Sequence, residues 1–272
     1  MNTRIRKSLR DLGLNRPRTA LLVASVAVGV AAAGGVLGAF DVIDREIDAS
    51  FASTSPADAI LTLDGDARPW VDTALEIPGV VAAEPRVEVL ARMEEQPGWQ
   101  RVTLVAVDDF DDVGVGAFFT DSGAAAPGRG EVLVERASLT EVDLAVGDPL
   151  AVSAPGQPAR DLTVVGLAHD PGRTPAWMFG NVVAYVTGQT LVDLGYADAL
   201  PSLLIRGDGA PSREANRLLA DDVAAHLQSA GATVTSIQTP VPGEHPASGV
   251  MATLVYLLQA FGLITLVASV AL

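Results

Sequence analysis

The chain has 272 residues, with 18 Lys and Arg against 33 Asp and Glu, so its formal net charge is −15. This acidity argues against nucleic-acid binding as the main function, because phosphate contacts need clustered basic side chains. The chain has no cysteine, which excludes disulfide scaffolds, thiolate metal sites and cysteine nucleophiles.

The first 19 residues differ from the rest because they are strongly basic. They hold six basic residues against one acidic residue, Asp11, for a net charge of +5. Ile5, Leu9 and Leu12 share one helical face, so we expect an amphipathic helix along the inner membrane surface, broken by Pro17 before the apolar segment that follows. The alternative is a frayed basic tail that only sets topology. The residues expected to set topology are Arg4, Arg6, Lys7, Arg10, Arg16 and Arg18.

Two apolar segments explain why so acidic a chain has a mean hydropathy of +0.33. Residues 21–40 and 253–272 are uncharged throughout, and at ~1.5 Å per residue each would form a helix ~30 Å long, the thickness of a bilayer core. We therefore predict transmembrane helices over residues 20–40 and 253–272. The intervening residues 41–252 carry a net charge of −20. The positive-inside rule then places residues 1–19 in the cytoplasm and residues 41–252 outside.

The first apolar segment has a second interpretation as a cleavable signal peptide. It is longer than a typical signal-peptide core, and residues 41–47 have the pattern of a helix that continues past the membrane, so we favour a retained span. No polar or basic residue follows the second segment. We accordingly expect the chain to continue beyond Leu272 in a longer membrane protein, the alternative being a natural tail-anchored end.

Small residues in the first segment are spaced for helix packing. Ser25 and Gly29 lie four residues apart, as do Gly34 and Gly38. This spacing places small side chains on one face and lets a second helix approach closely. The alternative is that glycine and alanine are simply common in this chain.

The outer segment has two similar groups of predicted elements near its ends. The first is a strand, a helix and two strands, and the second is a strand, a helix and a strand. The predicted ranges are 57–63, 69–77, 86–93 and 100–107 for the first group, and 201–206, 212–230 and 232–238 for the second. This order predicts an α+β domain with a split βαβ, ferredoxin-like layer.

The middle of the outer segment, about residues 112–196, has a different pattern. Short predicted strands alternate there with glycine and proline turns. Their ranges are 131–135, 149–153, 160–168 and 181–186. We expect a small β subdomain inserted into the flanking layer, with transmembrane helices on both sides of the whole α+β domain.

Residues that could carry catalysis are sparse. Lys7 is the only lysine, without the glycine-rich loop of an ATP site. His169, His226 and His245 lack metal-ligand spacing, and no nucleophile–base motif is present. We therefore expect no enzyme activity, no cofactor and no metal site.

One dense carboxylate cluster is present, made of Asp108, Asp109, Asp111 and Asp112. It could hold Ca²⁺, but it lacks the ordered ligand pattern of an EF-hand, and a solvated loop is the favoured interpretation. Whether this cluster binds an ion stays open at this point.

Several short motifs, in order, resemble those of FtsX/MacB-type ABC transporter permeases. They are residues 15–19 (NRPRT) before 27–30 (AVGV), residues 77–80 (IPGV) with 84–86 (EPR), residues 146–150 (VGDPL) with 163–167 (TVVGL), and residues 244–246 (EHP) before an apolar segment. Each motif is weak alone, and their order and spacing over the whole chain carry the resemblance.

The resemblance implies a multi-pass permease subunit of the bacterial inner membrane, with a MacB-like periplasmic core domain outside. It implies a dimer, or a pseudo-dimer with a second permease half, together with a separate cytoplasmic ATPase and an extracytoplasmic partner protein. In such a family ATP hydrolysis moves the outer domain for export, lipoprotein extraction or mechanotransmission. The family's ATPase-contacting segment follows the second span, so no residue of this chain is assigned to that contact.

Two other functions compete with this interpretation. One is a membrane-tethered extracytoplasmic binding or adaptor domain without a transport role. The other is an extracytoplasmic enzyme, which has only the acidic cluster in its favour. The sequence identifies neither a cargo nor the direction of force.

Overall fold

The computed structural model describes residues 16–95 and 98–271, with some side chains of residues 18–37, 95 and 263–271 left undescribed. The chain divides into two units. One contains the described residues of Met1–Ile47 and Ala247–Leu272, and the other is Asp48–Pro246. The amphipathic helix predicted over residues 3–14 lies outside the described residues.

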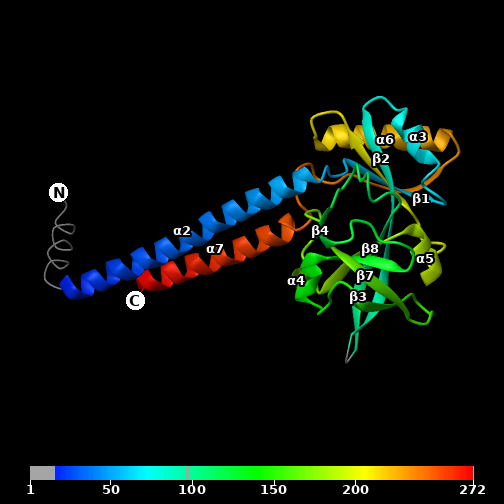
Figure 1. The fold of residues 1–272 in the computed structure, drawn as a ribbon. Coiled ribbons are helices and arrows are strands. Elements are labelled where there is room, and N and C mark those ends of the chain that lie inside the picture. The colour runs from blue at the N-terminus through cyan, green and yellow to red at the C-terminus, as the bar shows by residue number, and fades with distance from the viewer. Residues whose placement is uncertain (1–15, 96–97, 272) are drawn as a thin grey trace. The chain divides into compact units, whose positions relative to one another are not determined.

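The first unit is helical (Figure 1). It contains most of α2 (Arg16–Ser53) and α7 (Ser248–Ala271). Helix α2 runs through residues 41–47 without a break, so the predicted helical continuation past residue 40 is confirmed. Within the described residues, no helix reaches the combination of length and apolarity that a membrane crossing requires.

The second unit has one β-α-β group near its start and another near its end, and the two groups together form one layer. The first part comprises β1 (Ala59–Asp64), α3 (Trp70–Leu75) and the start of β2 (Val80–Glu95). The last part comprises β9 (Ser202–Gly207), α6 (Arg213–Ser229) and β10 (Thr233–Gln238). The strands pair antiparallel in the order β10-β1-β9-β2. This is the strand order of a split βαβ layer, as the sequence predicts.

Helices α3 and α6 cover one face of this layer (Figure 1). Ser212 begins α6, because its hydroxyl accepts a hydrogen bond from the backbone N–H of Ala215 at 3.1 Å. The apolar stripe of α6 then packs on the strands through Val223 and Leu227, which meet Leu61 in one buried cluster. Gly231, in a left-handed conformation, follows the helix and turns the chain into β10.

The inserted part continues the same sheet. Its strands are β3 (Gly98–Val107), β4 (Phe119–Gly123), β5 (Glu131–Glu135), β6 (Pro149–Ser153), β7 (Arg160–His169) and β8 (Asn181–Val186). From β2 the order runs β3-β8-β5-β7-β4, and β6 pairs with both β2 and β7. The pairs β3–β8 and β5–β7 are parallel, and the other pairs are antiparallel.

Strand β2 belongs to both parts, which explains its length of 16 residues. Its first half pairs with β9 and its second half with β3. Strand β3, assigned from sequence to the flanking layer, pairs with β8 and packs in the core of the inserted part. The sequence did not predict β4, the 3₁₀ helix η1 (Arg136–Thr140) or the short helices α4 (Ala176–Phe179) and α5 (Gly188–Leu194), because segments this short carry no clear periodicity.

Candidate functional site

The two ends of the second unit meet at one pair of aromatic rings. Phe51 lies in the last turn of α2, and His245 lies in the segment that leads to α7. Their ring centroids are 5.4 Å apart, with the planes at 84° to each other, an edge-to-face contact. Both side chains are buried. The place where the chain enters this unit is therefore in direct contact with the place where it leaves.

The loop of residues 170–173 lies against this contact. Phe51 packs on Gly172, where an added Cβ would come within 3.7 Å of the phenyl ring. His245 hydrogen-bonds with the backbone of Pro171 and Arg173. The same loop therefore contacts both ends of the unit. We call Phe51, His245 and the loop of residues 170–173 the junction.

Asp170 organises the loop from inside. Its carboxylate accepts hydrogen bonds from the backbone N–H of Gly172 at 2.7 Å and from the Tyr185 hydroxyl at 2.5 Å. Arg173 lies 3.4 Å from the same carboxylate and donates two hydrogen bonds to Glu88 on β2, at 2.9 and 2.5 Å. The junction is thus connected to the long strand of the sheet through charge-assisted hydrogen bonds.

Burial and charge shift the pKa values of these groups in consistent directions. Burial, followed by the charge of Asp170, raises the pKa of Tyr185 well above its ordinary value. Burial would raise the pKa of Glu88, but the charge and hydrogen bonds of Arg173 lower it below the ordinary value. Burial lowers the pKa of His245, and its hydrogen bonds and the charges of Asp48 and Asp170 only partly oppose this. The folded unit therefore favours Tyr185 and His245 in their neutral forms and Glu88 in its charged form.

A second connection runs from the end of α2 to β2. The backbone carbonyls of Thr54 and Ser55 accept hydrogen bonds from the N–H groups of Ala117 and Gly116, at 2.7 and 3.0 Å. The buried Arg86 donates to the carbonyl of Gly116 at 3.2 Å and pairs with Glu84 at 2.5 Å. Arg173 thus connects the junction loop with β2 through Glu88, and Arg86, itself on β2, connects that strand with the end of α2 through the carbonyl of Gly116.

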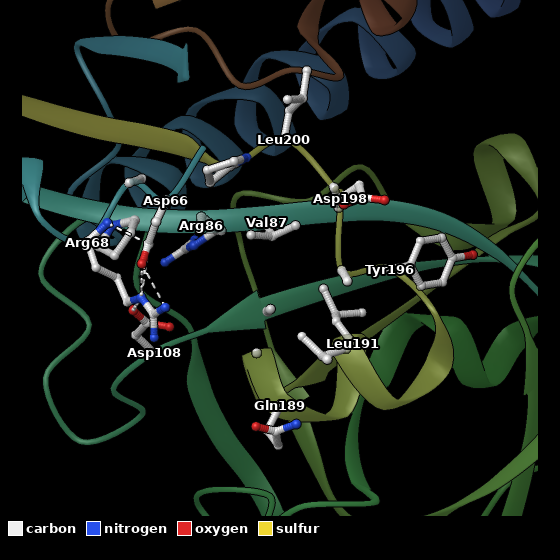
Figure 2. Close-up of a pocket in the computed structure, with 18 of the residues that line it drawn as sticks. Asp66, Arg68, Arg86, Val87, Asp108, Gln189, Leu191, Tyr196, Asp198 and Leu200 are labelled. Carbon is white, nitrogen blue, oxygen red and sulfur yellow. Dashed lines mark hydrogen bonds and ion pairs between the residues drawn. The ribbon is translucent and has the colours of Figure 1, made fainter. Parts of the chain in front are cut away.

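A pocket of about 650 Å³ opens between the flanking layer and the inserted part (Figure 2). On one side Arg68 makes hydrogen bonds of 2.7–3.0 Å with Asp66 and lies 4.0 Å from Asp108. Leu191 and Tyr196 line the opposite side in Figure 2, together with Leu200. The walls thus combine carboxylates with apolar side chains, and the volume falls in the range of small-ligand sites.

The carboxylates of this pocket differ in pKa. The hydrogen bond from Arg68 lowers the pKa of Asp66, whereas burial raises that of Asp108. Of the predicted acidic cluster, Asp108 is the one member that lines the pocket. Asp109 instead accepts a hydrogen bond from the backbone N–H of Asp111 at 2.9 Å and stabilises its own loop. Within the described residues, no group of three or more histidines and carboxylates is arranged to hold a metal ion.

The predicted helix-packing residues all lie on α2. The side chain of Ser25 is outside the described set. The positions that a Cβ would take at Gly29, Gly34 and Gly38 have no described heavy atom within 4 Å. Their role in packing against another helix stays a prediction.

The residues predicted to set topology are covered only in part. Arg4, Arg6, Lys7 and Arg10 lie outside the described residues. Arg16 begins α2 and is exposed, and Arg18 lies on α2 with its side chain undescribed. Their role likewise stays a prediction.

The three histidines have separate surroundings. His226 is exposed on α6, as its place on the polar face predicts. His169 lies 3.8 Å from Glu135, and burial lowers its pKa. His245, interpreted from sequence only as part of a proline-rich loop, is the residue of greatest interest because it belongs to the junction. The sequence signal that could have found the junction is the pattern 169–173 (HDPGR), a turn with an acid and a base directly after a strand.

A family model described as the MacB-like periplasmic core domain matches residues 19–235. A comparison with curated proteins finds no match. Three solved structures are similar over about two thirds of the chain.

The first is the periplasmic region of MacB from Actinobacillus actinomycetemcomitans, with 10% identity, a TM-score of 0.42, and coverage of 67% of this chain and 88% of that one. The second is the extracellular domain of the noncanonic ABC-type transporter YknZ from Gram-positive bacteria, with 14% identity, a TM-score of 0.41, and coverage of 68% and 99%. The third is a domain of a putative permease protein from Porphyromonas gingivalis, with 13% identity, a TM-score of 0.41, and coverage of 69% and 91%.

The family match spans most of the chain, including the whole first apolar segment, nearly all of the flanking layer and the inserted part. It agrees with the resemblance that the sequence motifs indicated. The chain therefore belongs to the family of MacB-like periplasmic core domains, which are parts of ABC transporter permeases.

Proposed function

We propose that the chain is the transmembrane and outer part of an ABC transporter permease. In this proposal a separate cytoplasmic ATPase drives movement of the membrane helices, and the outer unit converts that movement into export, lipoprotein extraction or mechanotransmission. The chain itself is proposed to catalyse no reaction. The observation that carries the proposal is the junction, together with membership of the family.

The junction supports force transmission for a geometric reason. Phe51 and His245 contact the same loop, and Arg173 connects that loop with the long strand β2. A displacement of either chain end would therefore reach the sheet through a few buried contacts. Packed contacts of this kind change between discrete arrangements and do not deform continuously.

The proposed topology places residues 1–19 in the cytoplasm, spans at residues 20–40 and 253–272, and residues 41–252 outside the bacterial inner membrane. It rests on the charge distribution of the sequence. Because the chain has no cysteine, single cysteines report on it without background. With a membrane-impermeant maleimide on intact cells whose outer barrier is opened, Ser229→Cys should be labelled, and Ser8→Cys only after the inner membrane is permeabilised. Labelling of Ser8→Cys in intact cells would overturn the topology.

The proposed partners are the ATPase and a second permease copy or half, with a further protein outside. Purification of the full-length protein in mild detergent should recover an ATPase with a P-loop motif. Cross-linking of the same sample should give a dimer, or a single chain with a second permease half. The absence of any co-purifying ATPase would contradict the proposal.

A second function, a membrane-tethered binding domain without a transport role, is favoured by the pocket of Figure 2. The two functions differ in what nucleotide does. In a transporter, ATP added to the complex should change hydrogen exchange in the 170–173 loop. In a tethered binding domain, exchange there should be the same with and without ATP.

A further inference from the structure

The solvent-facing side of the β2–β3 hairpin carries an uncommon combination of side chains. Leu90 and Arg92 on β2 point to this side, as do Trp99 and Arg101 on β3, because they alternate with buried residues such as Met93 and Val102. Leu90 and Trp99 are 58% and 54% exposed. They line a groove of about 660 Å³ whose rim is the turn of residues 153–157. We call this the hairpin groove.

The two arginines are placed against each other. In the antiparallel register Arg92 lies directly opposite Arg101. Like charges in directly opposite positions destabilise a sheet, so this pair costs stability in the free protein. Among the described side chains, neither arginine forms an ion pair, including with Glu94, which follows on the same face opposite Trp99.

Some exposed arginines of this unit have carboxylate partners, whereas others, such as Arg206 and Arg213, form no ion pair among the described side chains. Arg68, Arg129 and Arg136 are paired although they are exposed, with Asp66, Asp193 and Asp121. Residues 41–252, between the two predicted spans, carry a net charge of −20. Among the described side chains, Arg92 and Arg101 are adjacent and form no ion pair, so with Glu94 beside them they still form a small site of net positive charge in an acidic unit.

From this arrangement we infer that the hairpin groove binds an acidic segment of a partner protein, whose carboxylates pair with Arg92 and Arg101 while an apolar side chain packs on Leu90 and Trp99. The planar guanidinium matches a carboxylate with two parallel hydrogen bonds. Tryptophan and arginine are also the side chains that most often dominate binding energy at protein–protein interfaces. Most of the acidic surface would repel such a segment, so the same charge distribution that allows binding here disfavours it elsewhere.

This inference does not depend on coupling to an ATPase, since it concerns binding by the chain alone. The test uses the full chain in nanodiscs of zwitterionic phosphatidylcholine. The probe is a short N-acetylated peptide amide that alternates glutamate with phenylalanine, and binding is followed by calorimetry. Two comparison peptides replace glutamate with glutamine or phenylalanine with glycine.

Binding of the first peptide, and at least about tenfold weaker binding of both comparison peptides, is the expected result. Arg92→Gln and Arg101→Gln should each weaken binding about tenfold. Trp99→Ala should also weaken it. Arg217→Gln, at an exposed arginine of α6 that lies 3.9 Å from Asp221, is the matched control and should bind as the unmodified chain does.

Thermal stability gives a second readout, because the same substitutions should raise Tm while they weaken binding. Because each arginine repels the other, Arg92→Gln or Arg101→Gln should raise Tm slightly, by about 1–3 °C. A substitution that only damaged the fold would lower Tm and weaken binding together. Arg217→Gln removes an exposed i,i+4 pair and should leave Tm nearly unchanged.

Three results would overturn the inference. One is equal binding of the glutamate and glutamine peptides, because charge pairing would then play no part. Another is full binding by the double variant Arg92→Gln/Arg101→Gln. The last is stronger and arginine-dependent binding to vesicles of phosphatidylglycerol than to the peptide, which would assign the groove to a lipid surface.

Discussion

The ring of Phe51 meets the ring of His245 edge to face, and this contact joins the first turn of the second unit, Asp48–Pro246, with its last segment. Neither residue lies in the sheet, yet both contact the loop of residues 170–173, which is hydrogen-bonded to the buried Tyr185. The contact therefore closes the second unit at its two chain ends.

Removal of the Phe51 ring should open the junction. Phe51→Ala leaves a cavity beside Gly172 and His245, and the expected cost is about 3 kcal/mol. Thermal unfolding of the full chain, with hydrogen exchange of residues 170–173, measures this. Phe119→Ala is the control, because Phe119 on β4 is 46% exposed, and it should cost clearly less than Phe51→Ala. Unchanged exchange in the loop of the Phe51→Ala variant would contradict the role of this contact.

Loss of the Tyr185 hydroxyl should be costly because it faces a buried carboxylate. In Tyr185→Phe, Asp170 Oδ2 loses the 2.5 Å hydrogen bond from the Tyr185 hydroxyl. That oxygen then keeps only its 3.4 Å contact with Arg173. We expect a loss of about 1–3 kcal/mol in the free energy of unfolding. Tyr196→Phe is the matched control, since Tyr196 donates to the carbonyl of Leu90 from an exposed position. Equal losses in the two variants would show that the buried carboxylate adds nothing.

Acidification should weaken the junction through His245. The pKa of His245 is lower in the folded chain than its ordinary value of 6.5, mainly because the ring is buried. The neutral ring therefore contributes its full stabilisation above that value, and this is lost as pH falls toward the folded pKa. The Tm of the unmodified chain should fall more steeply than that of His245→Gln between about pH 8 and about pH 5.

The comparison with His245→Gln separates this effect from that of His169. The pKa of His169 is also lowered by burial, and that residue is present in both proteins. Glu135, whose pKa burial raises, acts in the opposite direction and is likewise common to both. Parallel Tm curves for the two proteins would rule out a contribution of His245.

Gly166 should tolerate no side chain, because β4 passes too close to β7. A Cβ at Gly166 would lie 2.5 Å from the carbonyl oxygen of Ala124 and 2.8 Å from that of Ser122. Gly166→Ala must therefore displace backbone, at an expected cost of at least about 2 kcal/mol. The matched control is Gly209→Ala, where no described heavy atom lies within 4 Å of the new Cβ. This control should leave stability unchanged or raise it slightly, and a harmless Gly166→Ala would mean that β4 does not pair here.

Several elements of the flanking layer and of the inserted part could be predicted from sequence because each has a local signal. Residues 212–230 combine a serine cap, an apolar stripe and a terminal glycine, and α6 follows that pattern closely. The strands near 131–135 and 181–186 have apolar runs bounded by turns, and β5 and β8 match them. Strand β2 was predicted too short, since the alternation covers only its middle, and pairing with β9 extends it to Val80.

The sequence by itself determined the charge distribution, the apolar segments, the βαβ order and the family, because these depend on composition, periodicity and short motifs. Only the tertiary structure decided that Phe51 meets His245 and that Arg92 lies opposite Arg101. Each of these pairs joins residues from different elements, and no local pattern encodes the register or the packing that brings them together. Asp170 shows the same division, since its place after a strand is visible in the sequence, whereas its burial against Tyr185 depends on how β7 and β8 lie in the sheet.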